Sequence, residues 1–259
     1  MNSTVILKGN ILYTPRPSEF ISIQYGYIIA VDGIVVYCGE SIPPAYADYE
    51  VTDYGDNLII PGFVDTHAHA PQYCNRGLGM DKELLPWLET YTFPEEAKFS
   101  DLEYARLVYG AFVQDLWRNG TTRSILFGTI HKESTLVLME LLQKAGLSAY
   151  VGKVNMDRNS PDFLIEETSQ SLADTKEWLE ASAQFGPLVK PIITPRFVPS
   201  CTSELMDGLG TLSEEYKVPV QSHLSENHGE IDWVGALHPE SPNYTDAYYE
   251  HKLRGGRQR

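Results

Sequence analysis

Two histidines stand two residues apart in the segment Thr66-His67-Ala68-His69. The apolar run from Leu58 to Val64 comes shortly before them and predicts a strand that is buried on both faces. Residues two apart on a strand point to the same face, so both imidazoles can reach one divalent cation. Two ordinary loop histidines are the alternative, but the position at the end of a buried strand favours a metal site.

The elements that must position these side chains fall into two regions. Residues 1–60 form short β-branched and aromatic runs with a hairpin signal at Asp32-Gly33, and they predict a small antiparallel β module. From 61 to 251, strand and helix patterns alternate, which predicts a parallel sheet. Strands are expected at 58–64, 124–130, 149–154, 189–194 and 218–223, and helices near 101–118, 133–145, 166–184 and 203–216.

The fold class is therefore α/β, with a partial TIM-like (β/α) barrel of about five βα units preceded by a small antiparallel β-sandwich module. A closed barrel of this kind has eight units, so residues 61–251 are expected to form an incomplete (β/α)₈ barrel. Residues 1–60 are expected to form the N-terminal half of a composite β-sandwich. The first strand ends in His-x-His, and the glycine-rich phosphate loop of a doubly wound sheet does not follow it.

Composition excludes several classes of function. The net charge is −15, from 35 acidic and 20 basic residues, and such a field repels nucleic acid and anionic membranes. The 3 cysteines include no C-x-x-C pair, so neither a disulfide framework nor a cysteine zinc site is expected. These features, and the lack of a signal-peptide pattern at the N-terminus, predict a cytoplasmic protein with a small-molecule substrate.

The last residues, 252–259, are strongly basic on an acidic protein and show no apolar periodicity. Two interpretations remain open. They form a solvated tail, or they are the product of a truncated or frame-shifted gene.

The run Pro61-Gly62-Phe63-Val64-Asp65-Thr66-His67-Ala68-His69 resembles the first-strand motif of the amidohydrolase superfamily. The resemblance implies that His67 and His69 bind a catalytic divalent metal and that His223, on the fifth predicted strand, is a third ligand. The spacing His223-Leu224-Ser225-Glu226 resembles the deaminase branch, which implies that Glu226 transfers protons.

Within this superfamily the chain most resembles the guanine deaminases, from about residue 57 to 251. Four segments carry the resemblance: His67–Tyr73, Leu85–Glu95, Thr194–Phe197 and His223–Asn227. It implies that Gln72 and Arg196 contact the edge of a purine and that Phe197 lines the pocket. These residue types suit a planar heterocycle, because a guanidinium donates, an amide both donates and accepts, and a phenyl ring stacks.

The implied reaction is hydrolysis of guanine to xanthine and ammonia, with water as the second reactant. One ion is expected, since the fourth predicted strand ends in Thr194-Pro195-Arg196 without the lysine that bridges two metals in related enzymes. Zinc suits imidazole ligands, and Fe²⁺ suits them almost as well. Related deaminases are dimers, so the resemblance also suggests a homodimer.

Two alternatives remain open. The chain could be an amidohydrolase deaminase that acts on a different amino-heterocycle, or an inactive fragment with residual metal binding. The sixth-strand histidine and eighth-strand aspartate of the family have no counterpart in these 259 residues, so we expect little guanine deaminase activity from the chain itself.

Overall fold

The computed structural model describes residues 3–253 and divides the chain into two compact units, residues 1–62 and 63–259. The first unit contains one four-stranded sheet, in the order β3-β2-β1-β4. Its elements are β1 (Thr4–Arg16), β2 (Glu19–Val31), β3 (Ile34–Gly39), the short 3₁₀ helix η1 (Pro44–Tyr46) and β4 (Val51–Ile59). The predicted turn between β2 and β3 is confirmed, because Asp32 and Gly33 both have positive φ, 50° and 80°.

The prediction of an entirely antiparallel module is wrong for one strand pair. β1 pairs with β2 and β2 with β3 in antiparallel register, but β4 runs parallel to β1. Residues 40–50 connect β3 to β4, and this long connection brings the chain back to enter the sheet in the direction of β1.

The apolar run at 58–64 does not form one strand buried on both faces, as we predicted. β4 ends at Ile59, and β5 (Phe63–His69) begins the second unit. Leu58 is 57% exposed and Phe63 is 59% exposed. A short apolar run does not distinguish one buried strand from two strand ends that meet at a unit boundary.

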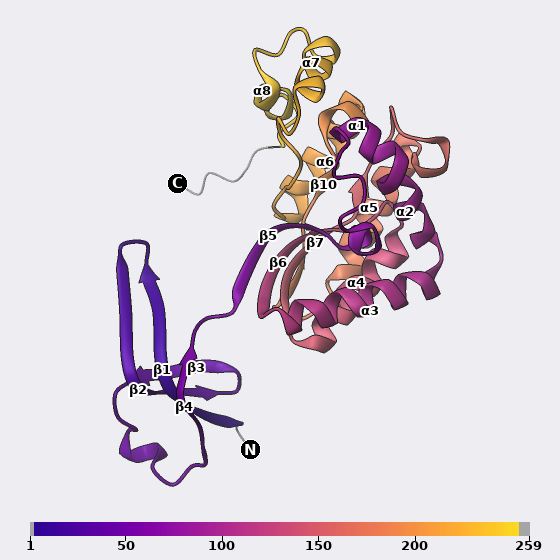
Figure 1. Ribbon diagram of the computed structural model, residues 1–259. Coiled ribbons are helices and arrows are strands. Elements are labelled where there is room, and N and C mark those ends of the chain that lie inside the picture. The colour runs from indigo at the N-terminus through magenta and orange to yellow at the C-terminus, as the bar shows by residue number, and fades with distance from the viewer. Residues whose placement is uncertain (1–2, 254–259) are drawn as a thin grey trace. The chain divides into compact units, whose positions relative to one another are not determined.

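The second unit is built on a parallel sheet in the order β5-β6-β7-β9, which confirms the α/β class. The strands after β5 are β6 (Thr121–Phe127), β7 (Ser148–Gly152) and β9 (Val189–Pro191), and the short strands β8 (Val154–Asn155) and β10 (Thr194–Pro195) pair in parallel beyond β7 and β9. The four long helices alternate with them: α3 (Leu102–Arg118), α4 (Lys132–Ala145), α5 (Thr168–Ser182) and α6 (Ser203–Tyr216). Figure 1 shows α3 and α4 side by side along one face of β5, β6 and β7.

The fifth predicted strand, 218–223, is not a regular strand. The segment runs parallel to the chain at 193–196 but forms only one bridge, between Ile193 and Val220. The Ile193 N–H donates to the Pro219 carbonyl at 2.9 Å, and the Gln221 N–H donates to the Ile193 carbonyl at 2.9 Å. Pro219 has no N–H to extend this ladder, which is one reason that regular pairing stops here.

Short helices make up most of the remaining structure. They are η2 (Ala70–Asn75), α1 (Leu84–Trp87), η3 (Leu88–Thr92), α2 (Phe93–Ala97), η4 (Lys98–Ser100), η5 (Asp162–Leu164), η6 (Val198–Ser200), α7 (His228–Leu237) and α8 (Tyr244–Tyr249).

Of the basic C-terminal residues, Leu253 is buried and Lys252 lies 3.3 Å from Glu214, while 254–259 lie outside the described residues. Among the described helices, none has the length and apolar character needed to cross a membrane.

The core of the second unit lies between the sheet and its helices. Leu126 and Val151 of the sheet, Leu142 of α4, Trp178 of α5 and Leu205 of α6 are all fully buried. Their side chains belong to one continuous cluster, so the strand ends that carry polar residues are held on a rigid support.

The close approach of β7 to residue 194 gives a prediction. A Cβ on Gly152 would lie 1.8 Å from the Thr194 Oγ1 and 2.7 Å from the Thr194 Cβ, so Gly152→Ala must displace the buried Thr194. The substitution is expected to lower the free energy of unfolding by about 1–3 kcal/mol. Gly110→Ala in α3 is the matched control, because its Cβ meets nothing within 4 Å and helix propensity should raise stability by about 0.5–1 kcal/mol. Urea unfolding measures both. An unchanged midpoint for Gly152→Ala would contradict the prediction.

Candidate functional site

One cavity of about 210 Å³ lies beyond the carboxyl ends of β5 and β10. It brings together all seven site residues expected from the sequence: His67, His69, Gln72, Arg196, Phe197, His223 and Glu226. Leu84, Trp87 and Leu88 complete the lining, from α1 and η3. A site at this edge is typical of parallel α/β sheets, because the loops that follow the strands converge there.

Three imidazoles of this cavity lie close together. One nitrogen from each of His67, His69 and His223 lies within 4.8 Å of the others. The His69 and His223 rings are nearly parallel, at 11°, with their Nε2 atoms 2.9 Å apart. The His67 ring stands almost perpendicular to both, at 81° and 88°. The strand spacing predicted for His67 and His69 therefore does bring both rings to one point.

Neighbouring groups orient two of these rings. His69 stacks on the buried ring of Phe127, at a centroid distance of 4.4 Å. The Nδ1 of His223 lies 2.7 Å from the carbonyl oxygen of Arg196. Because a carbonyl only accepts, the Nδ1 of His223 carries the proton and its Nε2 presents a lone pair to the cluster.

Burial keeps this pair neutral. It lowers the pKa of His69 well below its usual value, and the nearby His223 ring and the charged Arg196 guanidinium also disfavour protonation of His69. Burial and the charge of Arg196 also lower the pKa of His223, to about 4. The Nδ1 of His69 is buried and has no hydrogen-bond partner among residues 3–253. Neutral imidazole is the form that binds metal, so this donor set fits a divalent cation.

Glu226 lies on the same cavity, in the loop before α7. Desolvation of its carboxyl raises its pKa, and the negative charge of Glu230 raises it further. The Glu230 carboxylate accepts from the backbone N–H of Glu226 at 2.8 Å and closes the capping box of α7. Glu226 therefore has a fixed backbone and a carboxyl that holds a proton more readily than usual.

The same cavity contains the side chains expected to contact a heterocycle. Arg196 is 2% exposed, and its Nη1 donates to the Oε2 of Glu96 at 2.6 Å. The Nε2 of Gln72 donates to the other oxygen of the same carboxylate at 3.1 Å. Phe197 is buried and packs edge-on against Trp233.

Glu96 is not among the site residues expected from the sequence. It is 1% exposed in α2, yet nothing in the local pattern separates it from its neighbour Glu95, and two acidic residues in a short helix usually face solvent. Leu84 and Leu88, which line the cavity, were also missed, because apolar residues carry no chemical signal by themselves.

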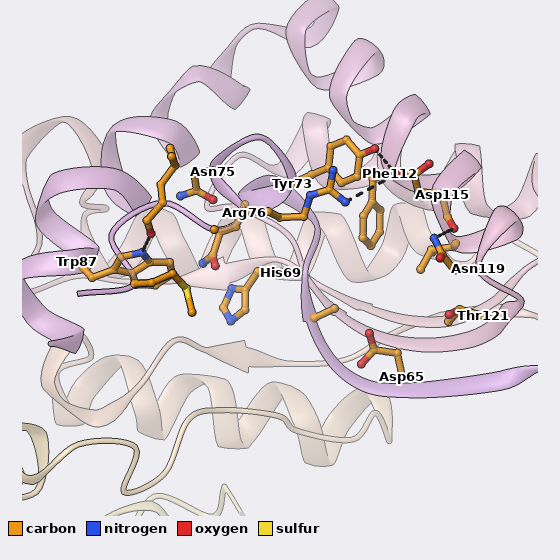
Figure 2. A pocket seen from close by; sticks show the side chains of 16 residues that line it. Asp65, His69, Tyr73, Asn75, Arg76, Trp87, Phe112, Asp115, Asn119 and Thr121 are labelled. Carbon is orange, nitrogen blue, oxygen red and sulfur yellow. Dashed lines mark hydrogen bonds and ion pairs between the residues drawn. The ribbon is translucent and has the colours of Figure 1, made fainter. Parts of the chain in front are cut away.

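A second cavity, of about 420 Å³, shares His69, Gln72 and Trp87 with the first. Figure 2 shows its polar side, where Tyr73, Arg76 and Asp115 lie together. The Tyr73 hydroxyl donates to Asp115 at 2.5 Å, and the Arg76 guanidinium lies 3.7 Å from the Tyr73 ring centroid. Tyr73, Arg76 and Asp115 therefore pair with one another. The His69 ring lines both cavities and lies where they meet.

The chain is similar in sequence and fold to known guanine deaminases. The chain is 52% identical over 204 residues to the guanine deaminase of Dictyostelium discoideum, covering 78% of this chain and 45% of that protein. It is 40% identical over 251 residues to the guanine deaminase of Escherichia coli K12, covering 93% and 56%. The crystal structure of guanine deaminase from C. acetobutylicum, with bound guanine in the active site, aligns with a TM-score of 0.94 and 51% identity, covering 97% and 60%.

The chain spans about half the length of these curated relatives. The sequence profile of the Amidohydrolase family matches residues 58–256, which is most of the chain and includes every residue named in the first cavity. The chain therefore belongs to the amidohydrolase family.

Proposed function

We propose that the protein is a zinc-dependent guanine deaminase, which hydrolyses guanine to xanthine and ammonia. One observation carries this proposal: the expected metal ligands, the proton-transfer carboxylate and the purine-contact residues all line a single cavity of about 210 Å³. The relatives named guanine deaminase support the choice of substrate over other amino-heterocycles.

His67, His69 and His223 would hold the ion, and we propose zinc because neutral imidazoles are among its usual ligands. When bound, such an ion supplies Lewis acidity, which lowers the pKa of water to about 7. The chain contributes the orientation of the ligands. The carbonyl of Arg196 holds the His223 ring through its Nδ1, and Phe127 supports the His69 ring.

Glu226 would accept a proton from the attacking water and pass it to a ring nitrogen of guanine. The oxygen of that water bonds to the carbon that carries the amino group. The remaining hydroxyl proton would then pass through Glu226 to the amino nitrogen, and the C–N bond breaks to release ammonia and leave the new ring carbonyl of xanthine. A carboxyl with a raised pKa suits the role, since it must hold the proton between the two transfers.

Arg196, Gln72 and Phe197 would hold the substrate ring. Among residues 3–253, the guanidinium of Arg196 has one side-chain partner, Glu96, so its other N–H groups are available to a carbonyl or ring nitrogen. Phe197 and the apolar wall of Leu84, Trp87 and Leu88 would exclude water around the ring.

Further expectations from the sequence accompany this proposal. The parallel sheet would be part of a (β/α) barrel, and the sheet of the first unit would be half of a composite sandwich. A homodimer would follow the family, and three free thiols suit a reducing compartment such as the cytoplasm.

The histidine cluster gives a prediction for metal binding. Replacing His67, His69 or His223 singly by alanine is expected to weaken zinc binding by more than about 10- to 100-fold. That range is the loss seen when a residue that only hydrogen-bonds to a metal ligand is removed, and loss of the ligand itself should cost more. Competition with a chromophoric chelator measures the affinity. His228→Ala is the control, because His228 is exposed and outside the cluster. Unchanged zinc affinity in any of the three variants would refute the ligand assignment.

The substrate proposal is tested first by binding, because affinity reports recognition of the ring separately from the chemical step. Calorimetry with the zinc-loaded protein should show guanine binding more tightly than cytosine or melamine. Tighter binding of melamine or cytosine would instead favour the alternative hypothesis, in which the protein deaminates another amino-heterocycle.

Turnover provides a second test. Xanthine and ammonia should form in equal amounts, and Glu226→Gln should slow their formation by about 10²- to 10⁴-fold while guanine still binds. An unchanged rate in that variant would exclude the role assigned to Glu226.

A further inference from the structure

The carboxylate of Glu96 joins two segments that are far apart in the sequence. Its Oε1 accepts from Gln72, 24 residues earlier, and its Oε2 accepts from Arg196, 100 residues later. Glu96 and Arg196 are among the most buried charged groups in the described chain, with side chains 1% and 3% exposed. Both partners line the cavity and Glu96 itself does not, so Glu96 acts on a ligand only through them.

The chemistry of Glu96 determines which atom of Gln72 is free. A carboxylate paired with a guanidinium only accepts hydrogen bonds, so the amide nitrogen of Gln72 must face Glu96. The amide oxygen of Gln72 has no hydrogen-bond partner among residues 3–253, and it remains available as an acceptor. Without Glu96, the amide could turn by 180° and present its N–H₂ group to the ligand instead.

The same carboxylate restricts Arg196. With Nη1 held by Glu96, the guanidinium also lies over the ring of Phe93, at 5.1 Å from its centroid. A guanidinium is planar, so fixing one nitrogen and one face fixes the direction of its remaining donors. Arg196 therefore offers donors to the cavity, while Gln72 offers an acceptor.

We propose that Glu96 is a positioning residue, which makes Arg196 the donor and Gln72 the acceptor in the cavity. By this arrangement it selects heterocycles with a ring N–H next to a ring carbonyl. This inference rests on the proposed function and deepens it. Guanine has such a lactam edge, with a donor for Gln72 and an acceptor for Arg196. Adenine presents the opposite polarity, an amino donor beside a ring acceptor, and would leave both protein groups unpaired.

The test compares the affinities of the zinc-loaded, 259-residue chain for guanine and adenine by calorimetry. Glu96→Gln should lower the ratio of guanine to adenine affinity by about 10- to 100-fold, because it removes charge-assisted bonds and frees the Gln72 amide to turn. Glu95→Gln is the matched control. Glu95 is equally a buried acid of α2, but its carboxylate bonds to Lys98 and Tyr104, neither of which lines the cavity.

Glu96→Gln leaves Arg196 as a buried charge without its ionic partner, so loss of folding is a risk. Glu96→Asp is therefore measured as well. It keeps a negative charge opposite Arg196, and its shorter side chain cannot reach both partners, so the affinity ratio should again fall. Zinc affinity should be unchanged in both variants, since Glu96 does not contact the three histidines.

A second readout separates failure of this inference from failure of the proposed function. The guanidinium N–H signals of Arg196 in ¹⁵N-edited NMR should be separate in the unaltered protein and merge in Glu96→Gln, as rotation becomes free. An unchanged affinity ratio with guanine still bound overturns the positioning role and leaves the proposed function intact. If neither purine binds, the proposed function fails, and the Arg196 signals alone test the positioning role of Glu96. Signals that Glu96→Gln leaves unchanged overturn that role, and signals that merge support it.

Discussion

The site depends on the burial of one arginine. Arg196 is 2% exposed, and a guanidinium in such a place needs a carboxylate partner, which Glu96 provides. The backbone of the same residue orients the histidine cluster, because its carbonyl accepts from the backbone N–H and the ring Nδ1 of His223. One residue therefore connects the part of the cavity that could hold a heterocycle with the part that could hold a metal.

The segment that carries His223 and Glu226 lacks the support of a regular strand and is held in other ways. The Ser222 hydroxyl donates to the Pro195 carbonyl at 2.7 Å, and the Tyr248 hydroxyl of α8 donates to the His223 carbonyl at 2.7 Å. Glu230 of α7 accepts from the Glu226 N–H. The two C-terminal helices thus fix a loop whose side chains must converge on the three-histidine cluster.

Charge and burial act differently on the histidines and on the Arg196–Glu96 pair. Low polarity around His69 and His223 lowers the pKa of both rings and keeps them neutral. The charges of Arg196 and Glu96 compensate each other, and among residues 3–253 the amide of Gln72 is the one neutral side chain bonded to this pair. The compensated pair therefore adds no net charge to the cavity.

The sequence by itself determined the local features. The alternation of strands and helices, the turn at Asp32-Gly33, and the convergence of His67 and His69 follow from periods of 2 and 3.6 residues, which act between near neighbours. The family resemblance added His223, Glu226, Gln72, Arg196 and Phe197, and these residues line one cavity.

Only the tertiary structure decided which acid pairs with Arg196. Glu95 and Glu96 are adjacent in one short helix, yet Glu95 bonds to Lys98 and Tyr104, whereas Glu96 reaches across 100 residues of sequence. It also decided that β4 runs parallel to β1 and that 218–223 forms a single bridge instead of a strand. Such pairings depend on how distant segments pack, and no pattern among near neighbours in the sequence records them.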